Sequence, residues 1–202
     1  MATAISADQV KQLRDKTGAG RMECKAALTE ANGNIDEAVT LLRKRGLAQA
    51  AKRAGRTTAQ GMIGSYIHMG GKIGVLLEVN CESDFVARTD DFQNLVKEVG
   101  MHIAAADPKW VRREDVPAEA IEKERGIYRA QMENTGKPAN VLDKIVEGKL
   151  GSFYSQFVLL DQPSVRDPNV TIAQLVAQTS AKTGENITVS RFVRFRVGEG
   201  ND

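Results

Sequence analysis

The spacing of apolar residues along the chain changes at about Gly61. Before this point, apolar residues recur every three to four positions, which is typical of helices. After it come two runs rich in Ile, Val, Leu and Tyr, residues 62–68 and 73–80, which are joined by the glycine-containing segment 69–72. Two such runs around a glycine turn predict a β-hairpin.

The first 46 residues predict three short helices. Ser6 is a suitable N-cap for the first, and the second covers residues 22–31. The third begins after Asn34, with Glu37 at the spacing of a capping box, and Gly46 is its predicted C-terminal stop. Four residues of the second helix are available for packing: Met22, Ala26, Ala27 and Leu28. We therefore expect a small three-helix bundle.

Helical spacing returns after the hairpin. A helix is predicted from Thr89, and Pro117 starts a charged helix that runs to about Asn134. Two further helical stretches follow, near residues 139–147 and 150–158, and another helix contains three apolar residues, Ile172, Leu175 and Val176. The first of these helices has a clear apolar face, which must cover a sheet: Phe92, Leu95, Val96, Val99 and Ile103.

The last stretch, residues 187–197, alternates with a period of two and predicts one more strand. The alternation places five apolar residues on one face and four polar ones on the other: Ile187, Val189, Val193, Phe195 and Val197 against Thr188, Ser190, Arg194 and Arg196. The predicted class is α+β, with an N-terminal bundle followed by a core that has a small antiparallel sheet covered by helices. We expect one domain at residues 1–54, including a linker helix. The other spans 55–202, with the hairpin and helices to about 137 and the C-terminal helices and last strand at 138–202.

Composition narrows the class of protein. The 202 residues carry 28 Lys and Arg against 26 Asp and Glu, so the net charge of +2 demands no polyanionic partner. The sequence shows no secretion signal and no membrane-spanning run, and Cys24 and Cys81 are expected to be free thiols, all of which predicts a cytoplasmic protein. Six basic residues between Arg43 and Arg56 leave an RNA-binding or ribosome-associated adaptor as the alternative to a solvated linker helix.

Signatures of catalysis are missing from the sequence. It contains no phosphate-binding glycine loop and no nucleophile elbow, and its His and Cys residues lack the spacing of metal ligands. A thiol enzyme built on Cys81 and His68 ranks last, because nothing orients a base or supplies an oxyanion site. We expect no enzymatic activity, no metal and no bound cofactor.

The segment after the second predicted strand, residues 78–88, is unusual because Asp84 and Phe85 stand side by side in a short connection. In one interpretation, Phe85 and Val86 fold inward and Asp84 caps a turn. In the other, Phe85 is an exposed anchor for a partner, since buried aromatic anchors dominate many interfaces.

Two stretches carry a family resemblance: LRDKTGAGRMECKAAL at 13–28 and EVNCESDFVAR at 78–88. With Gly184–Ile187, they make the chain resemble the elongation factor Ts family, which are guanine-nucleotide exchange factors of bacterial elongation factor Tu. The length resembles the short form without the coiled-coil insertion. Ser83 and Arg21 depart from the family pattern, which more often has Thr and Met there.

The resemblance implies a function. The N-terminal bundle would be a ubiquitin-associated-like domain that docks on elongation factor Tu, with Arg14, Arg21 and Met22 as candidate contacts. Asp84, Phe85 and Val86 would enter the partner near the Mg²⁺ and phosphates of its bound GDP and release that nucleotide so that GTP can bind. Short members of the family can also form homodimers, and the last strand offers an edge at which two chains can pair.

Overall fold

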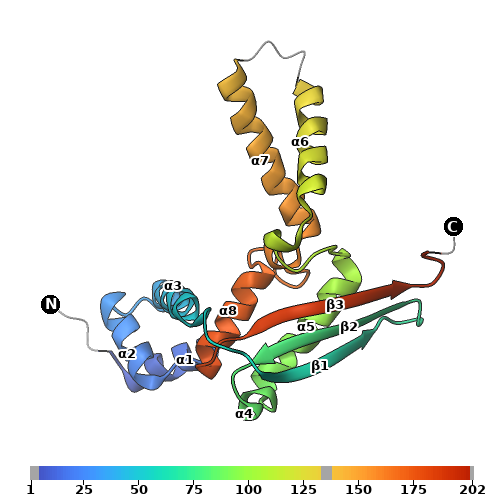
Figure 1. Cartoon of the computed structure of the whole chain (residues 1–202). Helices are drawn as coiled ribbons and strands as arrows, with labels where there is room; N and C mark the ends of the chain where they lie inside the picture. Colours follow the sequence, from blue (N-terminus) through green and yellow to red (C-terminus); the bar gives the residue numbers. More distant parts are fainter. Residues whose placement is uncertain (1–4, 133–137, 201–202) are drawn as a thin grey trace. The chain divides into compact units, whose positions relative to one another are not determined.

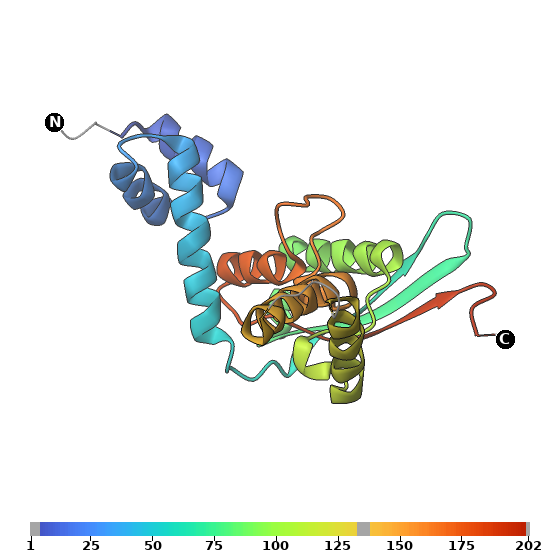
Figure 2. The same ribbon diagram turned by 90° about the horizontal axis from the view of Figure 1, so that it is seen from above.

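The computed structural model of the protein describes residues 5–132 and 138–200 (Figures 1 and 2). The chain forms two compact units. The first contains Met1–Gly61, Asn80–Leu95 and Val176–Thr188, and the second contains Met62–Val79, Val96–Leu175 and Val189–Asp202. The combination of helices with a small antiparallel sheet confirms the predicted α+β class. The division into domains at residues 54 and 55 stays a prediction.

Three helices at the start of the chain pack around a small apolar core (Figure 1). They are α1 (Ala7–Thr17), α2 (Arg21–Glu30) and α3 (Ile35–Arg53). The buried residues of this core are Val10, Leu13, Cys24, Ala27, Leu28, Ala31 and Ala38. The predicted three-helix bundle is confirmed, while its likeness to ubiquitin-associated domains stays a prediction.

Both predicted N-caps of the bundle are confirmed. The hydroxyl of Ser6 accepts a hydrogen bond from the N–H of Gln9 at 3.2 Å, and the Gln9 side chain accepts one from the N–H of Ser6 at 2.9 Å. At α3, Asn34 Oδ1 accepts from the N–H groups of Asp36 at 3.0 Å and Glu37 at 3.2 Å. These bonds satisfy N–H groups that have no partner inside the helix.

Gly46 does not end α3, contrary to the prediction. The helix continues to Arg53, and a Cβ at position 46 would lie 3.1 Å from the Cβ of Ala181. The absence of a side chain at Gly46 therefore lets a second segment approach closely, and this packing outweighs the intrinsic cost of glycine in a helix.

The packing face of α2 also differs in part from the prediction. Ala27 and Leu28 are buried as expected, but Met22 and Ala26 are exposed. Cys24, Ala27, Leu28 and Ala31 follow the i, i+3, i+4, i+7 spacing and form the buried stripe instead. Met22 therefore lies outside the core of the bundle.

The sheet has the strand order β1-β2-β3, with β1 at Gln60–Ile67, β2 at Ile73–Cys81 and β3 at Thr188–Arg196 (Figure 1). Gly70 and Gly71 have φ values of 89° and 69°, which glycine adopts without strain, and they close the predicted hairpin. The central strand β2 buries Val75, Leu77 and Val79.

Helix α5 (Asp90–Ala106) buries the predicted apolar face, and it packs closely on the hairpin (Figure 2). A Cβ at Gly64 of β1 would lie only 2.2 Å from Cγ1 of Val96. A Cβ at Gly100 of α5 would lie 3.3 Å from both Leu77 and Tyr66. Glycines on both elements thus allow the helix to approach the strands.

The predicted apolar face of β3 is buried only in its first part. Ile187 and Val189 are buried, but Val193 and Phe195 are exposed, and the Arg194 side chain is only 9% exposed. Arg194 Nε donates to the carbonyl oxygen of Ala104 at 3.3 Å, and its Nη1 pairs with Asp107 and Glu199. Because a guanidinium can be buried when it is paired in this way, the polar side of the strand is the inner side here.

Helices α6 (Ala118–Met132) and α7 (Ala139–Phe157) form a hairpin (Figure 1). Ion pairs join Arg125 to Glu147 and Arg129 to Asp143, so the paired positions run in opposite directions. The base of the hairpin packs around Val116, Phe153 and Val158. The two stretches predicted at 139–147 and 150–158 are one helix, and the predicted end of α6 near Asn134 lies outside the described residues.

Two short 3-10 turns, η1 (Arg113–Asp115) and η3 (Leu159–Asp161), flank this hairpin in the sequence. Helix α8 (Ile172–Thr183) follows and buries Ile172 and Val176. Gly184, with a φ of 78°, follows the end of α8 and leads to β3.

Candidate functional site

The connection between β2 and α5 contains a single helical turn, α4 (Asp84–Ala87). Ser83 is its N-cap: the backbone is extended there, and the hydroxyl accepts a hydrogen bond from the N–H of Val86 at 3.4 Å. Thr89 follows the turn, and its hydroxyl donates to the carbonyl oxygen of Val86 at 2.8 Å. Local hydrogen bonds therefore close the turn at both ends.

The turn directs the side chains of Phe85 and Val86 to different surroundings. Phe85 is 77% exposed, whereas Val86 is 8% exposed. Consecutive residues of a helix point about 100° apart, so burial of Val86 turns Phe85 outward. The interpretation in which both Phe85 and Val86 fold inward is therefore wrong for Phe85 and correct for Val86.

Asp84 does not cap the turn, because Ser83 does. Its carboxylate accepts a hydrogen bond from Nη2 of Arg88 at 2.8 Å, and both side chains are substantially exposed. An exposed ion pair of this kind contributes only about 0–1 kcal/mol, so a partner can replace Arg88 at little cost.

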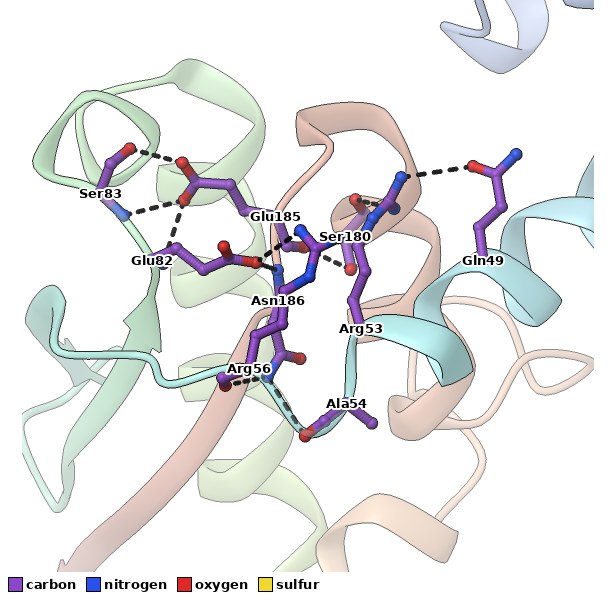
Figure 3. Close-up of polar contacts among 9 residues, drawn as sticks. All are labelled: Gln49, Arg53, Ala54, Arg56, Glu82, Ser83, Ser180, Glu185 and Asn186. Carbon is purple, nitrogen blue, oxygen red and sulfur yellow. Dashed lines mark hydrogen bonds and ion pairs between the residues drawn. The ribbon is translucent and has the colours of Figure 1, made fainter.

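The carboxylate of Glu185 holds the start of the turn (Figure 3). Its Oε2 accepts from the N–H groups of Glu82 and Ser83, each at 3.0 Å, and its Oε1 accepts from the Ser83 hydroxyl at 2.6 Å. Glu185 was not predicted as a site residue. More than a hundred positions separate it from Ser83, so no local pattern links the two.

A second carboxylate, that of Glu82, binds the backbone of the residue that follows Glu185. It accepts from the backbone N–H of Asn186 at 2.7 Å, and Arg56 Nη1 lies 3.5 Å from the same oxygen (Figure 3). The side-chain amide of Asn186 donates to the carbonyl oxygens of Arg56 at 2.9 Å and Ala54 at 3.4 Å. The segment after α8 is thereby fixed to both the turn and the end of α3.

Cys81 lies beneath the turn and supports it. The thiol is fully buried and donates to the carbonyl oxygen of Ser83 at 3.1 Å. Burial, followed by the negative charge of Glu185, raises the pKa of Cys81 above its usual value. A buried thiol with a raised pKa is a poor nucleophile, which argues against the thiol-enzyme alternative.

The three candidates in the N-terminal bundle are exposed. Arg14 lies in the last turn of α1, and Arg21 and Met22 begin α2. Met22 is 75% exposed and borders a shallow hollow whose other lining residues lie on the same helix: Lys25, Ala26, Thr29 and Glu30. An exposed methionine beside a hollow is typical of an adaptable contact surface.

The basic stretch between Arg43 and Arg56 lies mostly on α3 and is partly engaged within the protein. Arg45 pairs with Glu30, Arg53 donates to the carbonyl oxygen of Ser180 at 3.3 Å, and Arg56 pairs with Glu82. These contacts give Arg45, Arg53 and Arg56 a structural role, and Lys52 and Arg53 lie in the last turn of α3, where positive charge is favourable. The RNA-binding alternative remains a hypothesis.

Across residues 5–132 and 138–200, no group of three or more His, Cys, Asp or Glu side chains is arranged to hold a metal ion. Within the same ranges, none of the helices combines the length and apolarity needed to cross a membrane.

Comparison with known proteins identifies the family. The profile of the family described as elongation factor TS matches residues 1–199. The chain is 60% identical over 195 residues to an elongation factor Ts of Fervidobacterium nodosum, covering 96% of this chain and 99% of that protein. It is 58% identical over 196 residues to one of Caldanaerobacter subterraneus subsp. tengcongensis, covering 97% and 98%.

A third relative, the elongation factor Ts of Koribacter versatilis, is 59% identical over 195 residues, covering 96% of this chain and 89% of that protein. The similarity thus extends over nearly the whole of this chain and most of each relative. The chain belongs to the elongation factor Ts family of translation elongation factors, in a short form of about 200 residues.

Proposed function

We propose that this protein is the guanine-nucleotide exchange factor of elongation factor Tu, and that the α4 turn acts on the nucleotide site of that partner. The observation that carries the proposal is the exposure of Phe85, at 77%, on a turn whose neighbouring residue Val86 is buried. Family membership supports the identity of the partner. The protein itself makes and breaks no bonds in this role, and it needs no cofactor.

The α4 turn would act on the partner through the exposed ring of Phe85. A phenylalanine in water gains free energy when a partner pocket receives it, and such anchors dominate many interfaces. The ring sits on backbone that Ser83 and Val86 fix, so little conformational entropy is lost on binding. Phe85 therefore has the properties of a wedge between elements of a partner.

Displacement of those elements would release GDP. Mg²⁺ demands near-ideal octahedral ligands, so small shifts of the ligating groups weaken both metal and phosphate binding. Phe85 supplies the displacement, Asp84 makes polar contacts beside it after leaving Arg88, and Val86 anchors the turn from below. By linkage, nucleotide weakens the binding of the factor as much as the factor weakens that of nucleotide, so incoming GTP dissociates the complex.

Docking would use the bundle. Arg14, Arg21 and Met22 are exposed, and Met22 borders a hollow on α2. We assign this surface to contact with the nucleotide-binding domain of elongation factor Tu, which would hold the factor while the turn acts. The location proposed for this activity is the cytoplasm, in keeping with the free thiols of Cys24 and Cys81.

The deciding experiment is Phe85→Ala in a release assay with fluorescent GDP bound to purified elongation factor Tu. We expect the stimulated release rate to fall by at least about tenfold, the equivalent of losing about 1.4 kcal/mol. Met69→Ala is the matched control, because Met69 is a 90% exposed apolar side chain on the hairpin turn. Wild-type release by the Phe85 variant would remove the wedge from the mechanism.

A homodimer is also proposed, through the exposed face of the sheet. Ile63, Leu76 and Val193 line a shallow hollow on this face, and Phe195 of the edge strand β3 is 66% exposed. An apolar surface spread over three strands fits a second copy of the same face. Sedimentation equilibrium should find a wild-type dimer and a Phe195→Asp monomer, whereas a wild-type monomer would contradict this part of the proposal.

A further inference from the structure

We propose that Glu185 is the positioning residue of the exchange turn, which it holds in the conformation that presents Phe85. The inference rests on the proposed function of that turn. Glu185 acts through Glu82 and Ser83, and it makes no contact with the partner in this role.

The geometry of the carboxylate carries the inference. One oxygen accepts two backbone N–H groups, from Glu82 and Ser83, and the other accepts the Ser83 hydroxyl (Figure 3). Both polar hydrogens of the N-cap residue are therefore directed to Glu185. Hydrogen bonds to an ionised carboxylate are stronger than those between neutral groups, so this contact is well suited to fix a loop.

Ser83 passes the constraint to the turn. Its hydroxyl donates to Glu185 and at the same time accepts from the N–H of Val86 at 3.4 Å. This leaves the hydroxyl with one defined orientation. Ser83 and Val86, which lie before and after Phe85 in the chain, are both held in place, so the backbone that carries Phe85 is fixed. A four-residue turn has no intrinsic stability in water, so contacts of this kind must determine its conformation.

Glu185 is itself held on both sides. Its carbonyl oxygen accepts from the hydroxyl of Ser180, and the N–H of the next residue, Asn186, donates to Glu82 at 2.7 Å. The two segments are therefore bound to each other twice. The Glu185 carboxylate accepts from the backbone N–H of Glu82, and the Glu82 carboxylate accepts from the backbone N–H of Asn186. This reciprocal arrangement places Glu185 more rigidly than a single side-chain contact would.

Loss of the carboxylate would reduce the fraction of molecules whose turn is ready to act. The apparent affinity of a site falls in proportion to that fraction. We therefore expect Glu185→Ala to slow stimulated GDP release by about tenfold at a limiting concentration of factor. In Glu185→Gln, the amide oxygen accepts both N–H groups and the amide nitrogen donates to Ser83, so release should stay within about threefold of wild type.

A double-mutant cycle separates this role from general stability. If Glu185 acts through Phe85, then adding Glu185→Ala to Phe85→Ala causes little further loss of release, whereas independent effects multiply. Glu147→Gln is the control, since Glu147 is an exposed partner of Arg125 on the α6–α7 hairpin. Circular dichroism and thermal unfolding of every variant report on folding.

The outcomes are distinct. Multiplicative effects of the two substitutions, or wild-type release by Glu185→Ala, overturn the inference and leave the proposed function standing. Wild-type release by Phe85→Ala overturns both. If Glu185→Ala does not fold, Ser83→Ala takes its place in the same cycle, because it removes the hydroxyl through which Glu185 reaches Val86.

Discussion

The imidazole Nε2 of His102 lies 2.8 Å from Oε1 of Gln162, and both side chains are buried. The Gln162 amide nitrogen donates to the carbonyl oxygen of Gln156 at 2.7 Å, so Oε1 is the acceptor and His102 Nε2 the donor. On the other side of the ring, Nδ1 accepts from the N–H of Val165 at 3.3 Å. This pattern requires a neutral imidazole protonated at Nε2.

The stability of the protein should depend on the protonation of His102. Burial lowers the pKa of this imidazole below 6.5, although the contact with Gln162 and the charge of Glu98 oppose the shift. The unfolded chain therefore binds the proton first as pH falls, so the free energy of unfolding decreases below about pH 6.5 until the folded-state pKa is passed.

Urea unfolding from about pH 7.5 to about pH 5.5 measures this dependence. The comparison is with His102→Leu. At about pH 7.5, its free energy of unfolding should be about 1–3 kcal/mol lower than that of the wild type, because Gln162 and Val165 lose their hydrogen-bond partner. Its stability should also change less with pH in this range. An equal slope in the two proteins would show that other groups are responsible.

Arg194 should matter more to stability than its neighbour in the same strand. Its side chain is 9% exposed and contacts Ala104, Asp107 and Glu199. We expect Arg194→Ala to lower the free energy of unfolding by about 1–3 kcal/mol, since the carbonyl oxygen of the buried Ala104 loses a charged donor. The control is Arg196→Ala, an exposed position expected to change stability by less than about 0.5 kcal/mol. Equal effects in chemical denaturation would argue against a buried role for Arg194.

Two glycine-to-alanine substitutions should have opposite effects. At Gly64, a Cβ would lie 2.2 Å from Val96, so Gly64→Ala should destabilise by about 1–3 kcal/mol through overpacking. At Gly148, within α7, no atom other than those of the adjacent residues and the local helix backbone lies within 4 Å of the added Cβ, and alanine should stabilise the helix by about 0.5–1 kcal/mol. Thermal unfolding distinguishes the two, and a stable Gly64 variant would contradict the close packing of α5 on β1.

Met22→Ala tests the docking surface. Because Met22 is exposed, its removal should not reduce thermal stability, but it should raise the factor concentration needed for half-maximal GDP release by about three- to tenfold. The maximal rate should stay unchanged, since the turn that acts on the nucleotide is intact. A lowered maximum with unchanged half-saturation would instead place Met22 in the exchange step.

The sequence was informative where structure is decided locally. Ser6 and Asn34 were predictable as N-caps because a cap depends on the backbone N–H groups two or three residues later. The role of Gly46 was not, because it depends on Ala181, far along the chain. In β3, Val189 is buried whereas Phe195, at the same period-two spacing, is exposed, because which face is buried depends on what covers each part of the strand.

In the candidate site too, some features could be predicted from the local sequence and others depend on tertiary contacts. The pairing of Asp84 with Phe85 stood out in the sequence, whereas the direction of the ring depended on the burial of Val86. Glu185 belonged to a segment that resembled the family, yet its bonds to Ser83 arise from tertiary contacts alone. Sequence spacing carries no information about such pairs.

The continuation of α3 past Gly46 affects how two proposed contacts with the partner combine: that of the N-terminal bundle and that of the α4 turn. The helix runs for 19 residues, and the part after Leu42 extends beyond the bundle core as a stiff rod about 16 Å long, at about 1.5 Å per residue. A stiff tether fixes the local concentration that a second contact experiences after the first has formed, whereas a flexible one dilutes it. Each added residue would also rotate the far end by about 100°, so avidity should depend on the length of this rod in steps of whole helical turns.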